Sequence, residues 1–242
     1  MSDDSPSLLA FGARNMARRP LTSPRKHASQ ERSRATVEAL VEATARILVR
    51  EGFERASTNR IAREAGVSVG SLYQYYPSKE ALVVAVIDRH NEEIMSLVRA
   101  TVAQVAAEPV ERAIPKLVAA AIEAHRVNPR LHRVLAEQIP RTGQLENVEA
   151  FDRQNYELFR TYLENHRDEI RPLDLDMAAF VCVTSVEALT HTAVLHRPDF
   201  LTDAAVGALV EEATRLVLGY LREAPAGPAT RGARLPVHLA AG

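Results

Sequence analysis

The chain of 242 residues contains no Trp, a single Cys and only 5% aromatic residues. A lone cysteine, Cys182, cannot form a disulfide within the chain, so the sequence predicts a protein of a reducing compartment. The scarcity of aromatic residues, beside abundant Ala, Leu, Val, Glu and Arg, favours helices over sheets. With 46% hydrophobic and 25% charged residues, the composition is that of an ordinary globular protein.

Signals for membranes, export and catalysis are also scarce. We find no apolar run approaching the roughly 20 residues that a membrane span needs. The short apolar run at residues 8–11 follows two aspartates, unlike a signal peptide. The sequence has no HExxH motif, no glycine-rich phosphate loop, no cysteines at metal-ligand spacing and no nucleophile–base pattern. We therefore expect a cytoplasmic protein with no membrane partner, no cofactor and no enzymatic activity.

The net charge of −1 hides an uneven distribution. Residues 1–79 carry 13 Lys and Arg against 8 Asp and Glu, whereas residues 80–242 carry 17 against 23. A basic front and an acidic back indicate that only the front meets a polyanion, although solvated charges can also be uneven by chance.

Between two irregular ends, nearly every segment has the 3–4 residue apolar spacing of an amphipathic helix. Residues 1–28 form a predicted flexible basic arm and residues 223–242 a flexible tail. We predict an all-α fold, with a three-helix domain at 29–78 and a larger helical domain at 79–222. The predicted helices span about residues 30–51, 58–65, 69–75, 79–105, 109–127, 129–138, 145–167, 174–197 and 203–221.

Residues 58–76 carry the most informative pattern. Two short helices, capped by Ser57 or Thr58 and by Ser68, are joined by a tight turn at Gly66, which suits a positive φ. This is a helix-turn-helix, whose second helix enters the major groove of DNA. The expected DNA-facing positions of that second helix are Val69, Gly70, Ser71, Tyr73, Gln74 and Tyr75.

Neighbouring polar residues complete the expected surface. Thr58 and Ser68 begin the two short helices, where backbone N–H groups favour a phosphate. Lys79 begins the next helix and can add a charge contact to the DNA backbone. For base reading we favour Val69, Ser71, Gln74 and Tyr75, since Gln pairs well with adenine.

The pattern over about residues 30–90 resembles the N-terminal domain of TetR-family transcription regulators. Tyr76 stands where the family most often has Phe. The matching residues are Glu51-Gly52-Phe53, Thr58, Ile61-Ala62, Ala65-Gly66-Val67-Ser68, Gly70, Leu72-Tyr73, Tyr75-Tyr76 and Ser78-Lys79-Glu80-Ala81-Leu82.

The resemblance implies a homodimer that binds a palindromic operator and leaves it when a small-molecule effector binds the C-terminal helices. Repression is the family default. By position, the resemblance adds Asn59 and Arg60 to the DNA-facing set of Thr58, Ser68, Val69, Gly70, Ser71, Tyr73, Gln74, Tyr75 and Lys79.

The C-terminal half carries no signature motif. The helices at about 175–197 and 203–221 are apolar on more than one face, which favours a dimer interface, or else a larger core within the chain. Polar residues on otherwise apolar helices are candidates for an effector pocket, for surface or interface positions, or for metal ligands, although no second clustered pair fixes a metal site. These candidates are His125, His132, Gln138, Tyr156, Glu187, Thr190 and His191.

Two other functions remain open from the sequence. One is a helical ligand-binding protein or enzyme with a vestigial helix-turn-helix, which turnover of a ligand would reveal. The other is a nucleoid-type or constitutive DNA-binding protein that responds to no effector, which a failure to bind small molecules would favour.

Overall fold

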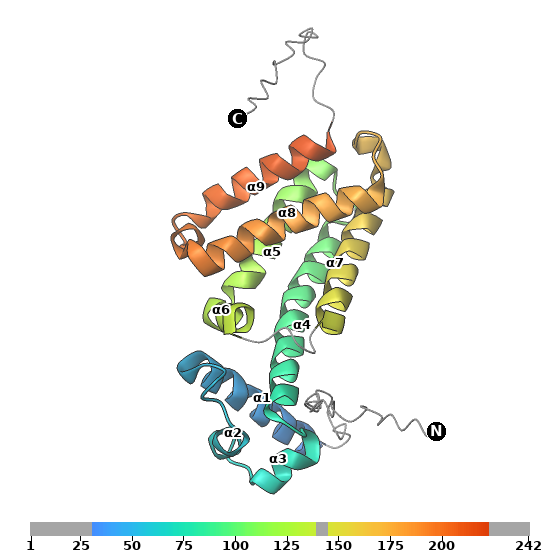
Figure 1. Cartoon of the computed structure of the whole chain (residues 1–242). Coiled ribbons are helices and arrows are strands. Elements are labelled where there is room, and N and C mark those ends of the chain that lie inside the picture. The colour runs from blue at the N-terminus through green and yellow to red at the C-terminus, as the bar shows by residue number, and fades with distance from the viewer. Residues whose placement is uncertain (1–30, 139–144, 223–242) are drawn as a thin grey trace, which may run out of the picture.

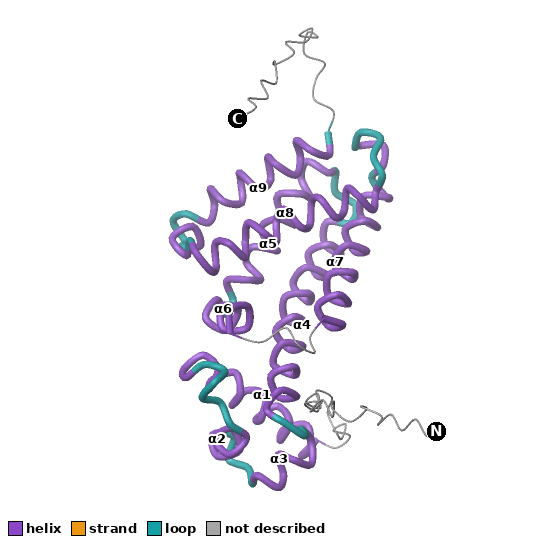
Figure 2. The backbone as a smooth tube through the Cα atoms, in the orientation of Figure 1, coloured by secondary structure: helices purple, strands orange, loops and turns teal. Residues whose placement is uncertain are grey.

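A computed structural model of the chain describes residues 31–138 and 145–222. These residues form nine α-helices and two short 3-10 helices, with no strand among them, which confirms the predicted all-α fold (Figures 1 and 2). The predicted basic arm and C-terminal tail lie outside the described residues. The helices are α1 (Glu31–Glu51), α2 (Thr58–Glu64), α3 (Val69–Tyr75), α4 (Lys79–Val105), α5 (Val110–Arg126), α6 (Pro129–Gln138), α7 (Leu145–Asn165), α8 (Leu175–His196) and α9 (Val206–Leu221), with 3-10 turns at Arg167–Glu169 and Pro198–Leu201.

Local sequence sets the helix ends. The side chains of Ser57, Ser68, Ser78 and Asp174 each accept a hydrogen bond from a backbone N–H of the first turn of α2, α3, α4 and α8. Gly52 has a φ of 80° directly after α1, a conformation that a side chain would strain. These helix ends were therefore readable from capping residues and a glycine. The start of α9 was not, since it has no side-chain cap and lies at Val206, three residues after the predicted start at 203.

The buried side chains form two hydrophobic cores. The first joins α1, α2, α3 and the beginning of α4, and the second joins the end of α4 with α5, α7, α8 and α9. Figure 1 shows α1–α3 grouped at one end of the molecule, with α4 running from them toward α7 and α8. A single long helix therefore belongs to both cores.

Helix α6 belongs to the first core, although we predicted it as part of the effector domain. Leu131 and Val134 are buried among the side chains of the DNA-binding helices, and Leu135 packs against them. The side chain of Gln138 accepts a hydrogen bond from the backbone N–H of Phe53 at 3.3 Å. The C-terminal half thus touches the N-terminal helices through α6 as well as through α4.

Helix α8 corrects one expectation from the sequence. It is long and apolar enough to cross a membrane by length and composition alone, with a mean hydropathy of 1.5 over 18 residues. The apolar run was missed because single polar residues such as Thr190 interrupt it, although its mean hydropathy stays high. In the structure α8 packs against α5, α7 and α9, and 39% of that window is buried. This is the packing of a core helix with one uncovered face.

Candidate DNA-binding surface and effector cavity

The helix-turn-helix is held by a small apolar centre. Ile61, Ala62 and Leu72 are completely buried between α2 and α3. At the turn Gly66 has a φ of 70°, and the N–H of Val67 donates to the carbonyl of Ala62 at 3.0 Å. A non-glycine residue would strain this turn, so the sequence places the two helices at a fixed angle.

The outward face of α3 contains Gly70, Tyr73 and Gln74, which are exposed. Their spacing of three and four residues places them on one side of the helix. Asn59 and Ser68 are exposed beside them, while Thr58 and Ser71 are half-buried. The hydroxyls of Thr58 and Tyr73 lie 3.1 Å apart, so a hydrogen bond links α2 to α3 at this surface.

The structure corrects the predicted role of Tyr75. Its side chain is only 7% exposed and packs in the first core. Val69, Leu72 and Tyr75 follow one another at intervals of three, so they share the inward face of α3. Val69 is half-buried and packs against the same core. The interval from Leu72 could have revealed that Tyr75 does not face the DNA.

Two of the predicted DNA-contacting cations are engaged within the chain. Arg60 forms an ion pair with Glu51 and donates to the carbonyl of Arg55 at 3.2 Å. The Lys79 ammonium donates to the carbonyl of Phe53 at 3.1 Å and lies 3.8 Å from the centroid of its ring. Both cations thereby hold the segment that joins α1 to α2, and a phosphate would compete with these contacts.

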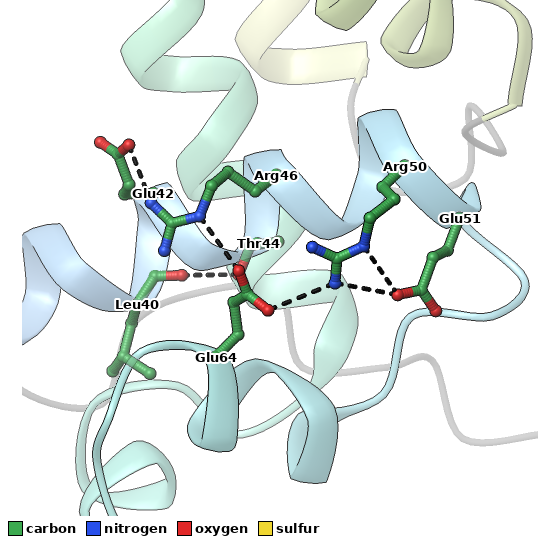
Figure 3. Close-up of polar contacts among 7 residues, drawn as sticks. All are labelled: Leu40, Glu42, Thr44, Arg46, Arg50, Glu51 and Glu64. Atoms are coloured by element: carbon green, nitrogen blue, oxygen red, sulfur yellow. Dashed lines mark hydrogen bonds and ion pairs between the residues drawn. The ribbon is translucent and has the colours of Figure 1, made fainter.

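Figure 3 shows a further ion-pair network between α1 and α2. Glu64 lies between Arg46 and Arg50, at 3.2 Å from each. Hydrogen bonds from Arg50, and then from Arg46, lower the pKa of Glu64. Much of the basic charge in the described part of the N-terminal domain is therefore paired with carboxylates, and residues 31–79 carry 8 Lys and Arg against 6 Asp and Glu.

A small hollow of about 70 Å³, partly open to solvent, lies between α4, α5, α7 and α8. Its walls are almost entirely apolar, and Asn155 and Glu187 supply a polar corner in which the Asn155 amide donates to the Glu187 carboxylate at 2.7 Å. The apolar walls consist mainly of Ile94, Val98 and Val102 of α4, Leu117, Val118 and Ala121 of α5, Phe151, Leu158 and Phe159 of α7, and Val183 and Val186 of α8.

Only two of the seven predicted pocket residues, His125 and Glu187, line this hollow. The rings of His132 and His191 instead lie edge-on to the ring of His125. The hydroxyl of Tyr156 lies 3.2 Å from that of Thr184.

The two remaining candidates are satisfied within the chain. Thr190 is buried, and its hydroxyl donates to the carbonyl of Val186 one turn earlier in α8 at 2.8 Å. Gln138 lies against the segment after α1 and tethers Phe53. A polar residue on an apolar helix was therefore an incomplete guide to the lining of the hollow, because most of these side chains contact other side chains or backbone groups of the chain.

Sequence reasoning missed three features of this region. The apolar cavity walls look like ordinary core positions, so no residue type marks them. Asn155 carries no signal until its contact with Glu187 is seen. His90 lies on α4, 42 residues before His132, and its Nε2 is 3.0 Å from the Nδ1 of His132.

Burial governs ionisation around the hollow. It lowers the pKa of His90 and of His125 to about 4 and that of His132 to about 2, so these imidazoles are neutral at physiological pH. Burial also raises the pKa of the Cys182 thiol, which lines the hollow, to about 12.

Comparison with known proteins agrees with this architecture. Residues 40–86 match the model of bacterial regulatory proteins of the tetR family, and residues 109–221 match a tetracyclin repressor-like C-terminal domain. The chain belongs to the TetR family. It is therefore a DNA-binding transcription regulator, with α3 in the position of the recognition helix.

Relatives at the sequence level are nucleoid occlusion factors named SlmA. The proteins from Glaesserella parasuis and Haemophilus ducreyi are each 30% identical to this chain over 116 residues, which are 48% of this chain and 55% of the relative. The match thus covers just over half the length of these relatives.

Several solved structures share the fold at low sequence identity. The fatty acid degradation regulator FadR from Bacillus halodurans is 20% identical, with a TM-score of 0.60 over 76% of this chain and 99% of that chain. SmeT, the repressor of the Stenotrophomonas maltophilia multidrug efflux pump SmeDEF, is 20% identical, with a TM-score of 0.58 over 84% of this chain and 100% of that chain.

Proposed function

We propose that the protein is a dimeric repressor whose operator affinity falls when an apolar molecule with one polar end binds in the hollow. The DNA-contacting surface would consist of the exposed face of α3 with Asn59 and the capping hydroxyls of α2 and α3. The residues assigned to it are Thr58, Asn59, Ser68, Gly70, Ser71, Tyr73 and Gln74, with Arg60 and Lys79 turning to phosphates from their contacts within the chain.

The observation that carries the effector response is the double role of α4. Leu82, Val83 and Val86 are buried in the first core, whereas Ile94, Val98 and Val102 of the same helix form one wall of the hollow. A molecule that displaces this wall changes the position of the DNA-binding helices. It shifts the equilibrium only if it prefers the conformation that does not fit the operator.

The walls of the hollow define the class of effector. Apolar walls with few polar groups suit a hydrophobic molecule, and the Asn155–Glu187 corner would orient one polar group. The amide favours a hydroxyl, carbonyl or amine near that corner. The carboxylate disfavours an anion directly beside it, since like charges repel.

Dimerisation through α8 and α9 would cover their exposed apolar side chains. Met177 and Phe180 of α8 are 56% and 51% exposed, and Leu189 of α8 and Leu216 of α9 are also exposed. Apolar side chains gathered on two adjacent helices are typical of an interface between subunits. A dimer would present two copies of α3 to one face of the duplex.

Filling the hollow tests the effector site. Ala121 of α5 lines it and Ala103 of α4 is exposed, which gives a matched pair of substitutions, Ala121→Leu and Ala103→Leu. A neutral fluorescent dye that brightens in apolar surroundings serves as the probe. We expect Ala121→Leu to weaken dye binding about tenfold, because overpacking costs about 1–3 kcal/mol, and Ala103→Leu to leave it unchanged. Equal dye affinity in both variants would contradict the assignment of the hollow.

A constitutive DNA-binding protein without effector is the second candidate. The relatives named nucleoid occlusion factors favour it, because that name refers to no small-molecule effector. The two functions separate in one experiment, in which an operator is selected from a random library and its affinity is measured with and without hydrophobic compounds that bind the hollow. A change of affinity supports the repressor. Binding of a compound that leaves DNA affinity unchanged supports the constitutive protein.

A further inference from the structure

Four histidines from four helices meet between the two cores. His90 lies on α4, His125 on α5, His132 on α6 and His191 on α8. The ring of His132 lies edge-on to those of His125 and His191, with centroids 4.8 and 4.5 Å away. One ring nitrogen from each of His125, His132 and His191 lies within 4.8 Å of the other two.

These separations are close to those of a metal site. Nitrogens bound to one tetrahedral zinc at about 2.0–2.1 Å are about 3.4 Å apart. Rotations of the rings that move each nitrogen by about 1 Å would close the remaining gap. Of the three, only His191 is exposed, so a metal ion has a route from the surface to the two buried ligands.

A buried nitrogen without a partner points to the same place. His132 is 7% exposed, and its Nε2 has no hydrogen-bond partner in the described part of the chain. The rings nearest to it are those of His125, His191 and His90. A buried polar atom left unpaired is destabilising, and coordination would remove this cost.

The second ring nitrogens of His125 and His132 already have hydrogen-bond partners. His125 Nδ1 lies 2.8 Å from the carbonyl of Ala121, so Nδ1 carries the proton and Nε2 keeps its lone pair. His132 Nδ1 lies 3.0 Å from His90 Nε2, and donation to His90 leaves the lone pair of His132 on Nε2. Metal-binding histidines are typically fixed in this way through their second nitrogen.

We propose that His125, His132 and His191 bind a divalent transition-metal ion, with His90 as a positioning residue for His132. Three imidazoles favour zinc, nickel or copper over magnesium or calcium, which prefer oxygen ligands. Zinc is the probe that we choose.

The site joins helices that matter for DNA binding. His132 lies on α6, whose neighbouring residues Leu131 and Val134 are buried in the core of the DNA-binding helices. His125 also lines the hollow. A bound ion would therefore fix α5, α6 and α8 relative to one another next to both sites. Metal binding itself requires neither an effector nor DNA.

Titration of the full chain tests the proposal. The protein, made without a histidine tag and freed of metal with a chelator, is titrated with zinc chloride in a calorimeter. We expect one zinc per chain. Replacing exposed His191 by Ala should weaken binding at least about 100-fold, since loss of an outer partner alone typically costs 10- to 100-fold. His196→Ala, an exposed histidine of the same helix, is the matched control and should leave the affinity unchanged.

A second variant tests the positioning role of His90. His90→Gln should weaken zinc binding by about 10- to 100-fold. It should also preserve the visible absorption bands of tetrahedral cobalt in the cobalt-loaded protein, because the three ligands remain. Circular dichroism establishes that the variants are folded. Absence of zinc binding to the folded wild-type chain, or equal zinc affinity in wild type and His191→Ala, would overturn the proposal and leave an ordinary buried histidine cluster.

Discussion

At the scale of single residues, exposure separates side chains that can contact DNA from those that build the helix-turn-helix. Gly70, Tyr73 and Gln74 lie on the outward face of α3, while Leu72 and Tyr75 lie on the inward face. Both groups have the residue types expected of a recognition helix. Only the helical period, counted from a residue that is known to be buried such as Leu72, distinguishes them.

Gln74 should contribute to base recognition. We expect Gln74→Ala to weaken binding to the selected operator by about 1–3 kcal/mol and to relax sequence preference at one base pair, as for a bidentate contact to adenine. Gln104→Ala, on the exposed face of α4, is the matched control and should bind normally. Fluorescence anisotropy with the operator and its single-base variants measures both effects, and an unchanged preference in Gln74→Ala would remove Gln74 from the contacts.

The thiol of Cys182 should be inert in the folded protein. Its raised pKa of about 12 means that the thiolate, which is the reactive form, is scarce at pH 8. We expect alkylation to be about 1,000-fold slower than for an unfolded thiol with a pKa of about 8.5, and the rate to rise with pH beyond pH 9 instead of levelling off. Mass spectrometry of the alkylated protein, with and without urea, measures the rates; equal rates would show that burial does not protect this thiol.

At the scale of helices, the α1–α2 contact combines an apolar centre with an exposed ion-pair network. Ile61 is completely buried, whereas Glu64 with Arg46 and Arg50 lies at the surface. Exposed ion pairs are screened by water and salt, so they contribute little to the free energy of unfolding. The apolar centre therefore dominates the stability of the helix-turn-helix.

Two substitutions compare these contributions. We expect Ile61→Ala to lower the free energy of unfolding by about 2–5 kcal/mol, and Glu64→Gln to lower it far less, because its ion pairs are screened by solvent. Urea unfolding followed by circular dichroism measures both. A larger effect for Glu64→Gln than for Ile61→Ala would mean that the network, and not the core, holds α2 on α1.

The apolar face of α8 should hold two subunits together. Phe180→Glu places a charge in the proposed interface and should convert the dimer to a monomer at micromolar concentration, because an unpaired buried charge is costly. Leu97→Glu changes an exposed apolar side chain of α4 in the same way and should leave the dimer intact. Sedimentation velocity gives the masses, and a monomeric wild type would refute the interface.

At the scale of the whole molecule, the proposed dimer would bind DNA through two copies of α3 presented at a fixed distance. A symmetric dimer predicts operator half-sites whose centres lie about 34–36 Å apart or a multiple of that. Contacts to phosphates release counterions, so affinity should fall steeply as salt increases. Helix α4, which belongs to both cores, is the element through which a molecule in the hollow would alter that distance.

Salt dependence provides the test at this scale. We expect a linear fall of log affinity with log salt, with a slope of about −0.9 for each phosphate neutralised. Lys79→Ala should make the slope shallower by about 1, because Lys79 can exchange its Phe53 contact for a phosphate. Measurement of operator affinity over a series of salt concentrations gives the slopes; an unchanged slope in Lys79→Ala would show that this lysine only holds the segment after α1.

The sequence by itself determined the all-α fold, the capped helix starts and the helix-turn-helix, because caps, glycines and apolar spacing act within a few residues of the chain. It also identified the family resemblance, since the signature at residues 51–82 is continuous. Tertiary structure alone decided that α6 joins the DNA-binding core and that His90 meets His132 across 42 residues. A cavity and a histidine cluster arise from the way separate helices pack, and neither the spacing nor the type of a residue within one helix specifies its neighbours on another.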